Sequence, residues 1–212
     1  MNAFVELSAA QQVEGRPFTD TDHNERDLAA MRRILASLIR LIAEPREWPA
    51  PPQHLVVRGD HDGKVVREVV CNCPALLAGG PLFVVAFLGH RRTDLDTTIL
   101  SAVDDDLIHE FPLHPGVLSY SSFEHDHGNY VNLVLMDGPG ARDHWRVSSR
   151  HAYAARDLAP EFYVHVRLQN AVLPRGLSDP AGLRLVATKY YDYEREPLWL
   201  AMRRLGEPAP AG

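Results

Sequence analysis

Residues 81–173 alternate between two hydrophobic periodicities, and this alternation restricts the fold more than any other feature of the chain. The segment "PLFVVAFLGH" is almost continuously apolar, as a buried strand is, and the next segment repeats an apolar residue every fourth position, as an amphipathic helix does. The repeated residues are Leu95, Ile99, Val103, Leu107 and Phe111. Strands over 117–124 and 130–136 follow as a hairpin, because "HDHGN" between them has the composition of a turn.

A second helix and a last strand complete the pattern. The segment "GPGARDHWRVSSRHAYAARDL" predicts a helix with Asp137 as its cap and Pro139 in its first turn, ending before Ala159 and Pro160. The segment "EFYVHVRLQNAVLP" predicts the strand. The order β-α-β-β-α-β is the split unit of the ferredoxin-like fold. We therefore expect an α+β protein with a ferredoxin-like core, an antiparallel sheet and both core helices on one face.

The residues before this core predict a helix and a β-hairpin. Cap-type residues begin and a proline cluster ends a helix near 21–44. Its apolar seam consists of Leu28, Met31, Leu35, Leu38 and Ile42, widened by Ile34, Ile39 and Leu41. The seam packs either against the body of the chain, which is the simpler interpretation, or against a second copy. Strands near 54–58 and 64–72 flank "DHDG", a hairpin signal.

The residues after the core predict one more strand, in "LRLVATKYYDY", and a short terminal helix, in "PLWLAMRRL". The segment "PALLAGG" has the composition of a connection. The chain thus divides into an N-terminal helix and β-hairpin extension (1–78), the ferredoxin-like core (79–175) and a C-terminal strand, helix and tail (176–212). With 212 residues and 45% hydrophobic content, we expect a single globular unit with a sizeable core.

Charge and motif content exclude several classes. A formal net charge of -6 with scattered Lys and Arg indicates no nucleic-acid surface. No segment approaches the roughly 20 apolar residues of a membrane span, and the first residues do not resemble a signal peptide, so we expect a cytoplasmic protein without a membrane partner. Phosphate-binding Gly-rich loops, G-x-S-x-G elbows and H-E-x-x-H pairs are absent from the sequence.

Two short motifs resemble metal or redox sites. Cys71 and Cys73, in "CNC", are too few for a disulfide framework or a zinc site, and we expect small strand residues rather than a redox pair. In "FEHDHGNY", His125 and His127 flank Asp126, but a solvated hairpin tip supplies no third rigid ligand. The sequence therefore predicts no metal site apart from a haem, which is considered below.

The last core strand has two different faces. Phe162, Val164, Val166 and Leu168 fall on one side, and Tyr163, His165, Arg167 and Gln169 fall on the other. The hairpin strands add Tyr120 and Asn132. Because both core helices are expected on one face of the sheet, the polar and aromatic side chains of the other face suit a ligand chamber. On the second core helix, Trp145 lies on the sheet-facing arc, while His144 and His151 share one flank.

A strand, a short turn, a helix bearing Trp about six residues before His, and a further strand resemble the antibiotic biosynthesis monooxygenase-like family of the dimeric α/β-barrels. The matching residues are Trp145 and His151, in "HWRVSSRH", and the resemblance covers 81–173. It implies a homodimer whose two sheets pack into a barrel and a chamber between sheet and helices. It also implies chemistry on polycyclic substrates with dioxygen and no cofactor, or, in related barrels, haem held by a helix histidine.

The first hypothesis is an oxygen-using, monooxygenase-like enzyme acting on a small aromatic or polycyclic metabolite. His165 or His151 removes a proton, and Arg167 with Gln169 stabilises the negative charge that forms. The expected substrate-binding residues are Trp145, Tyr163, Gln169, Tyr120, Asn132 and His144. Two alternatives stay open: a haem enzyme with His151 on the iron, and a non-catalytic ligand-binding or stress-response protein. A lyase or isomerase would use the same residues.

Overall fold

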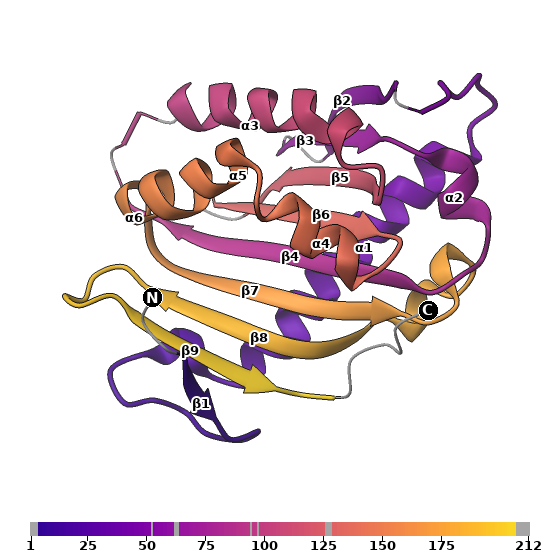
Figure 1. The fold of residues 1–212 in the computed structure, drawn as a ribbon. Helices are drawn as coiled ribbons and strands as arrows, with labels where there is room; N and C mark the ends of the chain where they lie inside the picture. The colour runs from indigo at the N-terminus through magenta and orange to yellow at the C-terminus, as the bar shows by residue number, and fades with distance from the viewer. Residues whose placement is uncertain are drawn as a thin grey trace.

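One mixed sheet runs through the whole protein. The computed structural model describes residues 4–51, 53–61, 64–93, 95–96, 98–125 and 129–206, which form nine strands in a single sheet (Figure 1). In spatial order the strands are β1 (Val5–Leu7), β9 (Trp199–Arg204), β8 (Arg184–Asp192), β7 (Tyr163–Leu173), β4 (Leu82–Arg91), β6 (Tyr130–Met136), β5 (Val117–Glu124), β3 (Lys64–Val70) and β2 (Leu55–His61). β1 pairs in parallel with β9, and every other pair of neighbours is antiparallel. The α+β class is as predicted, but the sheet is larger than predicted and not purely antiparallel.

The four strands predicted for the core are adjacent, in the order β7-β4-β6-β5. Helix α3 (Thr98–Glu110) connects β4 to β5, and the helical residues 139–162 connect β6 to β7. The sheet continues beyond β7 through β8, β9 and β1, and beyond β5 through β3 and β2. Strands from all three predicted segments of the chain therefore share one sheet.

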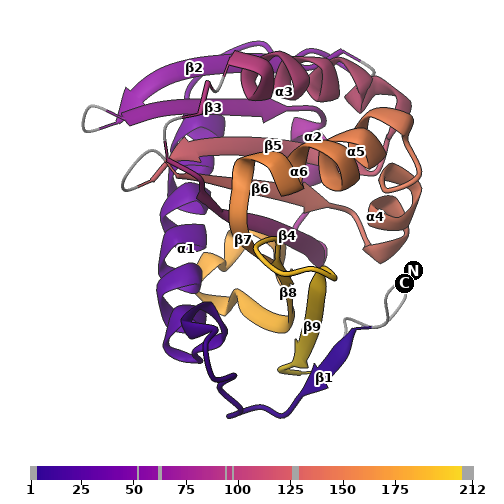
Figure 2. The ribbon, with the colours of Figure 1, turned by 90° about the vertical axis from the view of Figure 1, so that its left-hand side faces the viewer.

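Helix α1 (Asp22–Ala43) is the long helix on one face of the sheet (Figure 2). The predicted helix is confirmed, and its seam packs within the chain, because Met31, Leu35 and Leu38 are fully buried against sheet residues such as Val84 and Leu133. Burying such aliphatic side chains is worth about 1.5–3 kcal/mol each. The face that the sequence analysis reserved for a ligand chamber is therefore covered by a helix.

The opposite face carries α3 and a series of short helices (Figure 2). These are α4 (Pro139–Trp145), α5 (Ser149–Tyr153), the π-helical turn η4 (Ala154–Leu158) and α6 (Ala159–Phe162). The sequence predicted a single helix that ends before Ala159. Both parts of this prediction are wrong, because the segment is broken into short helices and stays helical beyond Ala159. The chain breaks after α4 and restarts at Ser148, whose side chain accepts a hydrogen bond from the backbone N–H of His151. It then continues through Pro160, because that proline lies in the first turn of α6, where its missing N–H is not needed.

The predicted C-terminal helix is wrong, since "PLWLAMRRL" contains β9. Ala201 and Arg203 are both fully buried, two positions apart, which is the period of a strand. The guanidinium of Arg203 donates to the Tyr190 hydroxyl and to the backbone carbonyls of Ser8 and Thr19. These bonds hold the N-terminal segment in place beside β9, where β1 pairs.

A buried carboxylate attaches α1 to the sheet. Asp27 is 2% exposed, and it accepts two hydrogen bonds from Arg167, at 2.9 and 2.7 Å, and one from Gln169, at 2.7 Å. Gln169 in turn accepts a hydrogen bond from the Thr188 hydroxyl at 2.6 Å. A buried charge is tolerated only when paired and hydrogen-bonded, so this cluster fixes the position of α1 over β7 and β8. We call it the Asp27 cluster, meaning Asp27, Arg167, Gln169 and Thr188.

Asp27→Leu should lower the free energy of unfolding by about 3–5 kcal/mol, because it leaves the Arg167 guanidinium buried without its partner. Adding Arg167→Met should restore stability to within about 2 kcal/mol of the wild type, since the charge is then removed. Urea denaturation measures both values. The control is Glu25→Leu, an exposed acid of the same helix, expected to change stability by about 0.5 kcal/mol or less. If Asp27→Leu alone lowers the free energy of unfolding by less than about 1 kcal/mol, the cluster does not hold α1.

Candidate functional site

The structure divides the predicted site residues between the two faces of the sheet. His165, Arg167 and Gln169 face α1, as the Asp27 cluster and the contact between Phe18 and His165 show. The residues on the face covered by α3 to α6 are Tyr120, Asn132, Tyr163, His144, Trp145 and His151. His144 and His151 therefore lie on one side of the sheet and His165 on the other, so these three imidazoles do not form one site.

Tyr163 was expected on the same face as His165, but a β-bulge separates them. The pairing of β4 with β7 shifts between His90 and Arg91, so that His165 lies opposite His90 and Tyr163 lies opposite Arg91. Tyr163 then packs on Phe87 with ring centroids 5.0 Å apart. Gly89 gives this ring its space, because a Cβ there would lie 2.3 Å from it. Burial raises the pKa of Tyr163 to about 12, so its hydroxyl is neutral.

On the α1 face, His165 lies in a stack of rings. Its centroid is 4.3 Å from that of Phe18 and 4.9 Å from that of His90, with interplanar angles of 8° and 10°. Burial, and then the neighbouring His90 and Arg167, lower the pKa of His165 to about 3. The imidazole is therefore neutral at pH 7. The donors of Arg167 and Gln169 that were expected to stabilise a substrate anion are bonded to Asp27, so an external anion would compete with a buried carboxylate.

On the other face, a continuous series of ring contacts leads from the sheet into the helices. Tyr120 lies 5.6 Å from Phe111, Phe111 lies 5.8 Å from Trp145, and Trp145 lies 4.7 Å from His151, measured between ring centroids. Burial, followed by Arg146 and His114, lowers the pKa of His151 to about 4. The series, which we call the aromatic row, thus ends in a neutral imidazole packed on an indole. The sequence identified three of its members and missed Phe111 as a site residue.

A second histidine pair lies beside the aromatic row. The Nδ1 atoms of His114 and His144 are 3.4 Å apart, so one of them must carry a proton and the other accept it if they are hydrogen-bonded. Burial and the neighbouring His144 lower the pKa of His114. The sequence predicted His144 and overlooked His114, which precedes β5 and comes close only through the fold.

Buried polar atoms without a partner among the described residues occur on this face. They are the Asn132 amide oxygen Oδ1, the Trp145 indole nitrogen Nε1 and the Glu110 carboxylate oxygen Oε2. The other carboxylate oxygen of Glu110 pairs with Arg150 at 3.3 Å. Buried polar atoms in proteins nearly always have a protein, water or ligand partner. The indole nitrogen is a donor and the two oxygens are acceptors, so each of them needs a water or a bound molecule as its partner.

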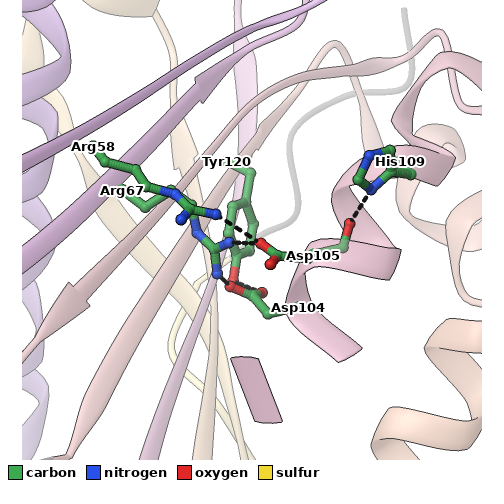
Figure 3. Close-up of polar contacts among 6 residues, drawn as sticks. All are labelled: Arg58, Arg67, Asp104, Asp105, His109 and Tyr120. Atoms are coloured by element: carbon green, nitrogen blue, oxygen red, sulfur yellow. Dashed lines mark hydrogen bonds and ion pairs between the residues drawn. The ribbon is translucent and has the colours of Figure 1, made fainter. Parts of the chain in front are cut away.

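Acidic side chains on α3 hold this helix against β3 and β5 (Figure 3). The Tyr120 hydroxyl donates to Asp104, and Arg67 pairs with both Asp104 and Asp105. Arg58 also reaches Asp105, at 3.1 Å. Burial raises the pKa of Tyr120, so its hydroxyl stays protonated and can donate.

The buried face of α3 differs in part from the predicted one. The repeat of every fourth residue predicted that Leu95, Ile99, Val103, Leu107 and Phe111 share the buried face. Phe111 is buried as predicted, and Ile108, outside the repeat, is buried too, whereas Leu95 and Ile99 are 38% and 45% exposed. Steps of four residues drift by about 40° each around a helix with 3.6 residues per turn, so a long repeat of four does not stay on one face.

The short motifs contribute no metal or disulfide. Cys71 and Cys73 are free thiols, as expected, but neither is a strand residue: Cys71 follows the end of β3, and Cys73 begins α2 (Cys73–Leu77). Burial raises the pKa of Cys71 to about 12. Within the described ranges, no three His, Cys, Asp or Glu side chains are placed to hold a metal ion. Asp126 and His127 of the hairpin tip lie outside those ranges. In the same part of the chain, no helix has the length and apolar character needed to cross a membrane.

Comparisons with known proteins identify no family. No protein-family description matches the sequence, and no curated protein matches it significantly. A protein of Shewanella oneidensis, SO0527, shares 16% identity over 45% of this chain and 94% of its own, with a TM-score of 0.37. An aldoxime dehydratase shares 12% identity over 70% of this chain and 37% of its own, with a TM-score of 0.28. With TM-scores this low, neither similarity defines the fold or the activity of the chain.

The low pKa of His151 makes stability depend on pH. The unfolded chain binds a proton at this residue below about pH 6.5, whereas the folded chain does so only near pH 4, so stability is lost as the pH falls between these values. Between pH 7 and pH 5, the free energy of unfolding of the wild type should therefore fall by about 2 kcal/mol more than that of His151→Phe. Urea denaturation at both pH values measures the difference. His109→Phe, an exposed histidine on α3, should follow the wild type. Equal losses in wild type and His151→Phe would contradict a buried neutral His151.

Proposed function

We propose that the protein is a monooxygenase-like enzyme that holds a small aromatic metabolite between the sheet and helices α3 to α6. One observation carries this proposal: the aromatic row is bordered by buried polar atoms that have no partner among the described residues. Rings provide stacking surfaces for a planar substrate, and unpaired donors and acceptors fix its orientation. The α1 face offers less, because the Asp27 cluster already pairs its own charges.

The proposed roles follow from protonation states. His151, a neutral imidazole, accepts the proton, and Trp145 supplies the stacking surface. The amide oxygen of Asn132 accepts a hydrogen bond from the substrate, and the neutral hydroxyls of Tyr120 and Tyr163 lie on the same face. A base with a pKa near 4 removes only an acidic proton, which favours a ring CH₂ group whose carbanion is delocalised onto a conjugated carbonyl. The resulting carbanion gives its electrons to dioxygen, so that a CH₂ group becomes C=O and the second oxygen leaves as water.

We also propose that strands β4 to β7 and their helical connections form a ferredoxin-like core. Support comes from the strand order β7-β4-β6-β5 with a helical connection after β4 and another after β6. The homodimer implied by the family resemblance would need a different surface from a barrel dimer. In a barrel the open face of each sheet packs against its partner, and here α1 covers that face.

The haem alternative has less support. It assigns the iron to His151, whose ring packs on Trp145 at 4.7 Å among buried side chains. Haem could reach this imidazole only if the indole moved. The residues as placed do not fit haem, and no step is assigned to it. The non-catalytic alternative shares the aromatic row and differs only in turnover.

Oxygen uptake tests the proposal. With anthrone or 1-naphthol as trial substrates, which have a ring CH₂ group in their keto forms, wild type should show saturable uptake, and His151→Gln should lower it by about 100-fold or more, the usual contribution of a general base. The control His109→Gln should equal the wild type. Uptake unaffected by His151→Gln would remove this histidine from the mechanism. Saturable binding without uptake would favour the non-catalytic protein, and a Soret band on adding haemin, lost in His151→Ala, would favour the haem protein.

A further inference from the structure

A cleft lies outside the proposed site, where the residues after α1 meet the beginning of β5. Its volume is about 260 Å³. The lining residues are Pro51, His54, Cys71, Asn72, Phe111, Pro112, Pro115 and Val117. Phe111 is the wall between the cleft and the aromatic row, because its ring also contacts Tyr120 and Trp145. None of the residues expected from the sequence to bind substrate lines it.

We propose that this cleft is a second binding site, and that its ligand is a small, uncharged, one-ring aromatic molecule carrying a hydroxyl group. The site goes beyond the proposed function, because it shares only Phe111 with the aromatic row, has its own polar group in His54 and needs no reaction. Four of its walls come from segments that the sequence analysis treated as connections or strand ends.

Volume limits the ligand to one ring. An engineered apolar cavity of about 150 Å³ holds benzene, and sites for drug-sized ligands begin near 300 Å³. The cleft, at about 260 Å³, lies between these values. A benzene ring with one or two small substituents fits, whereas a polycyclic molecule does not.

The walls favour a planar, apolar ligand. Three prolines and Phe111 have little side-chain freedom to lose, so ordering them on binding costs little entropy. Phe111 is 2% exposed and fixed by its two ring contacts, and Val117 is 1% exposed. The cleft is therefore formed before a ligand arrives, and flat rings can pack against its prolines and phenylalanine.

The polar groups of the cleft select a neutral ligand with a hydroxyl. Neither a carboxylate nor an ammonium or guanidinium lines it, so an ionic ligand would be desolvated without a counter-charge. The oxygen of Asn72 already accepts a hydrogen bond from the Ala75 N–H at 3.0 Å. This leaves the Asn72 NH₂ group as a donor and His54 as the side chain that can also accept. The Nδ1 of His54 is buried without a partner among the described residues, and burial lowers the pKa of His54, which keeps the ring neutral. A neutral imidazole can both donate to and accept from a hydroxyl.

Fluorine NMR with two matched probes tests this site. 4-Fluorophenol and 4-fluorotoluene have nearly the same shape and differ in the hydroxyl, so the ratio of their dissociation constants isolates its contribution. Wild type should bind the phenol about fivefold more tightly, as expected for one net hydrogen bond. His54→Phe should abolish the preference, His54→Gln should retain part of it, and 4-fluorobenzoate should bind to none of them. Far-ultraviolet circular dichroism checks that each variant folds.

A further variant separates this site from the proposed active site. Asn132→Leu alters the aromatic-row side of the sheet and should leave the affinity of 4-fluorophenol unchanged, whereas a loss of affinity would place the probe there and overturn the second site. Equal binding of phenol and toluene by wild type, a preference that survives in His54→Phe, or no binding of either probe would also overturn it. Oxygen uptake that depends on His151 is measured independently, so either proposal can fail without the other.

Discussion

The position of α1 depends on the buried carboxylate of Asp27. A charge with 2% exposure is unfavourable unless several donors surround it, and here the guanidinium of Arg167 and the amide of Gln169 supply them. Both donors come from β7, about 140 residues further along the chain. Apolar packing of Met31, Leu35 and Leu38 alone would allow α1 to slide or rotate on the sheet, since hydrophobic burial has no direction. The hydrogen bonds to Asp27 select one position.

That position determines which face of the sheet is free for function. With α1 docked, Arg167 and Gln169 are engaged within the protein, and His165 is confined between Phe18 and His90. The α1 face then resembles a completed polar network more than an open site, because most of its groups pair with one another. The other face combines ring contacts with buried atoms that lack protein partners. The α1 face also has two buried atoms without a partner among the described residues, the Nδ1 of His165 and the Oε1 of Glu68, but its main donors are bonded to Asp27. The aromatic row is therefore the basis for placing the proposed site on the second face.

Local periodicity predicted much of the fold correctly. The strands near 82–91, 117–124, 130–136 and 163–173 and the helix at 22–43 follow from patterns that repeat within a few residues. The errors occur where a distant partner changes the preference of a residue. Arg203 lies in the predicted terminal helix, but hydrogen bonds to the Tyr190 hydroxyl and to backbone carbonyls hold it as a buried strand residue.

The predicted site failed for similar reasons. Alternation along β7 correctly placed His165, Arg167 and Gln169 together, but no local signal shows that Asp27 would pair with two of them. The bulge opposite His90 moved Tyr163 to the other face, and a bulge leaves no mark in hydrophobic alternation. Trp145 and His151 were found because they share one helical segment. Phe111, His114 and His54 were missed because each lies in or near a proline-containing connection whose path is set by tertiary contacts.

Phe111 links the two proposed sites. Its ring forms one wall of the cleft and contacts Tyr120 and Trp145 on the opposite side. A ligand in the cleft would contact this ring, so any coupling between the cleft and the aromatic row would pass through Phe111. By thermodynamic linkage, any such effect is reciprocal: a molecule bound in the row changes affinity in the cleft by the same factor. A change at Phe111 alters both sites at once, whereas His54 and Asn132 each belong to one of them. The two proposed sites share Phe111 but have different polar groups. Variants of His54 and Asn132 therefore test each site separately.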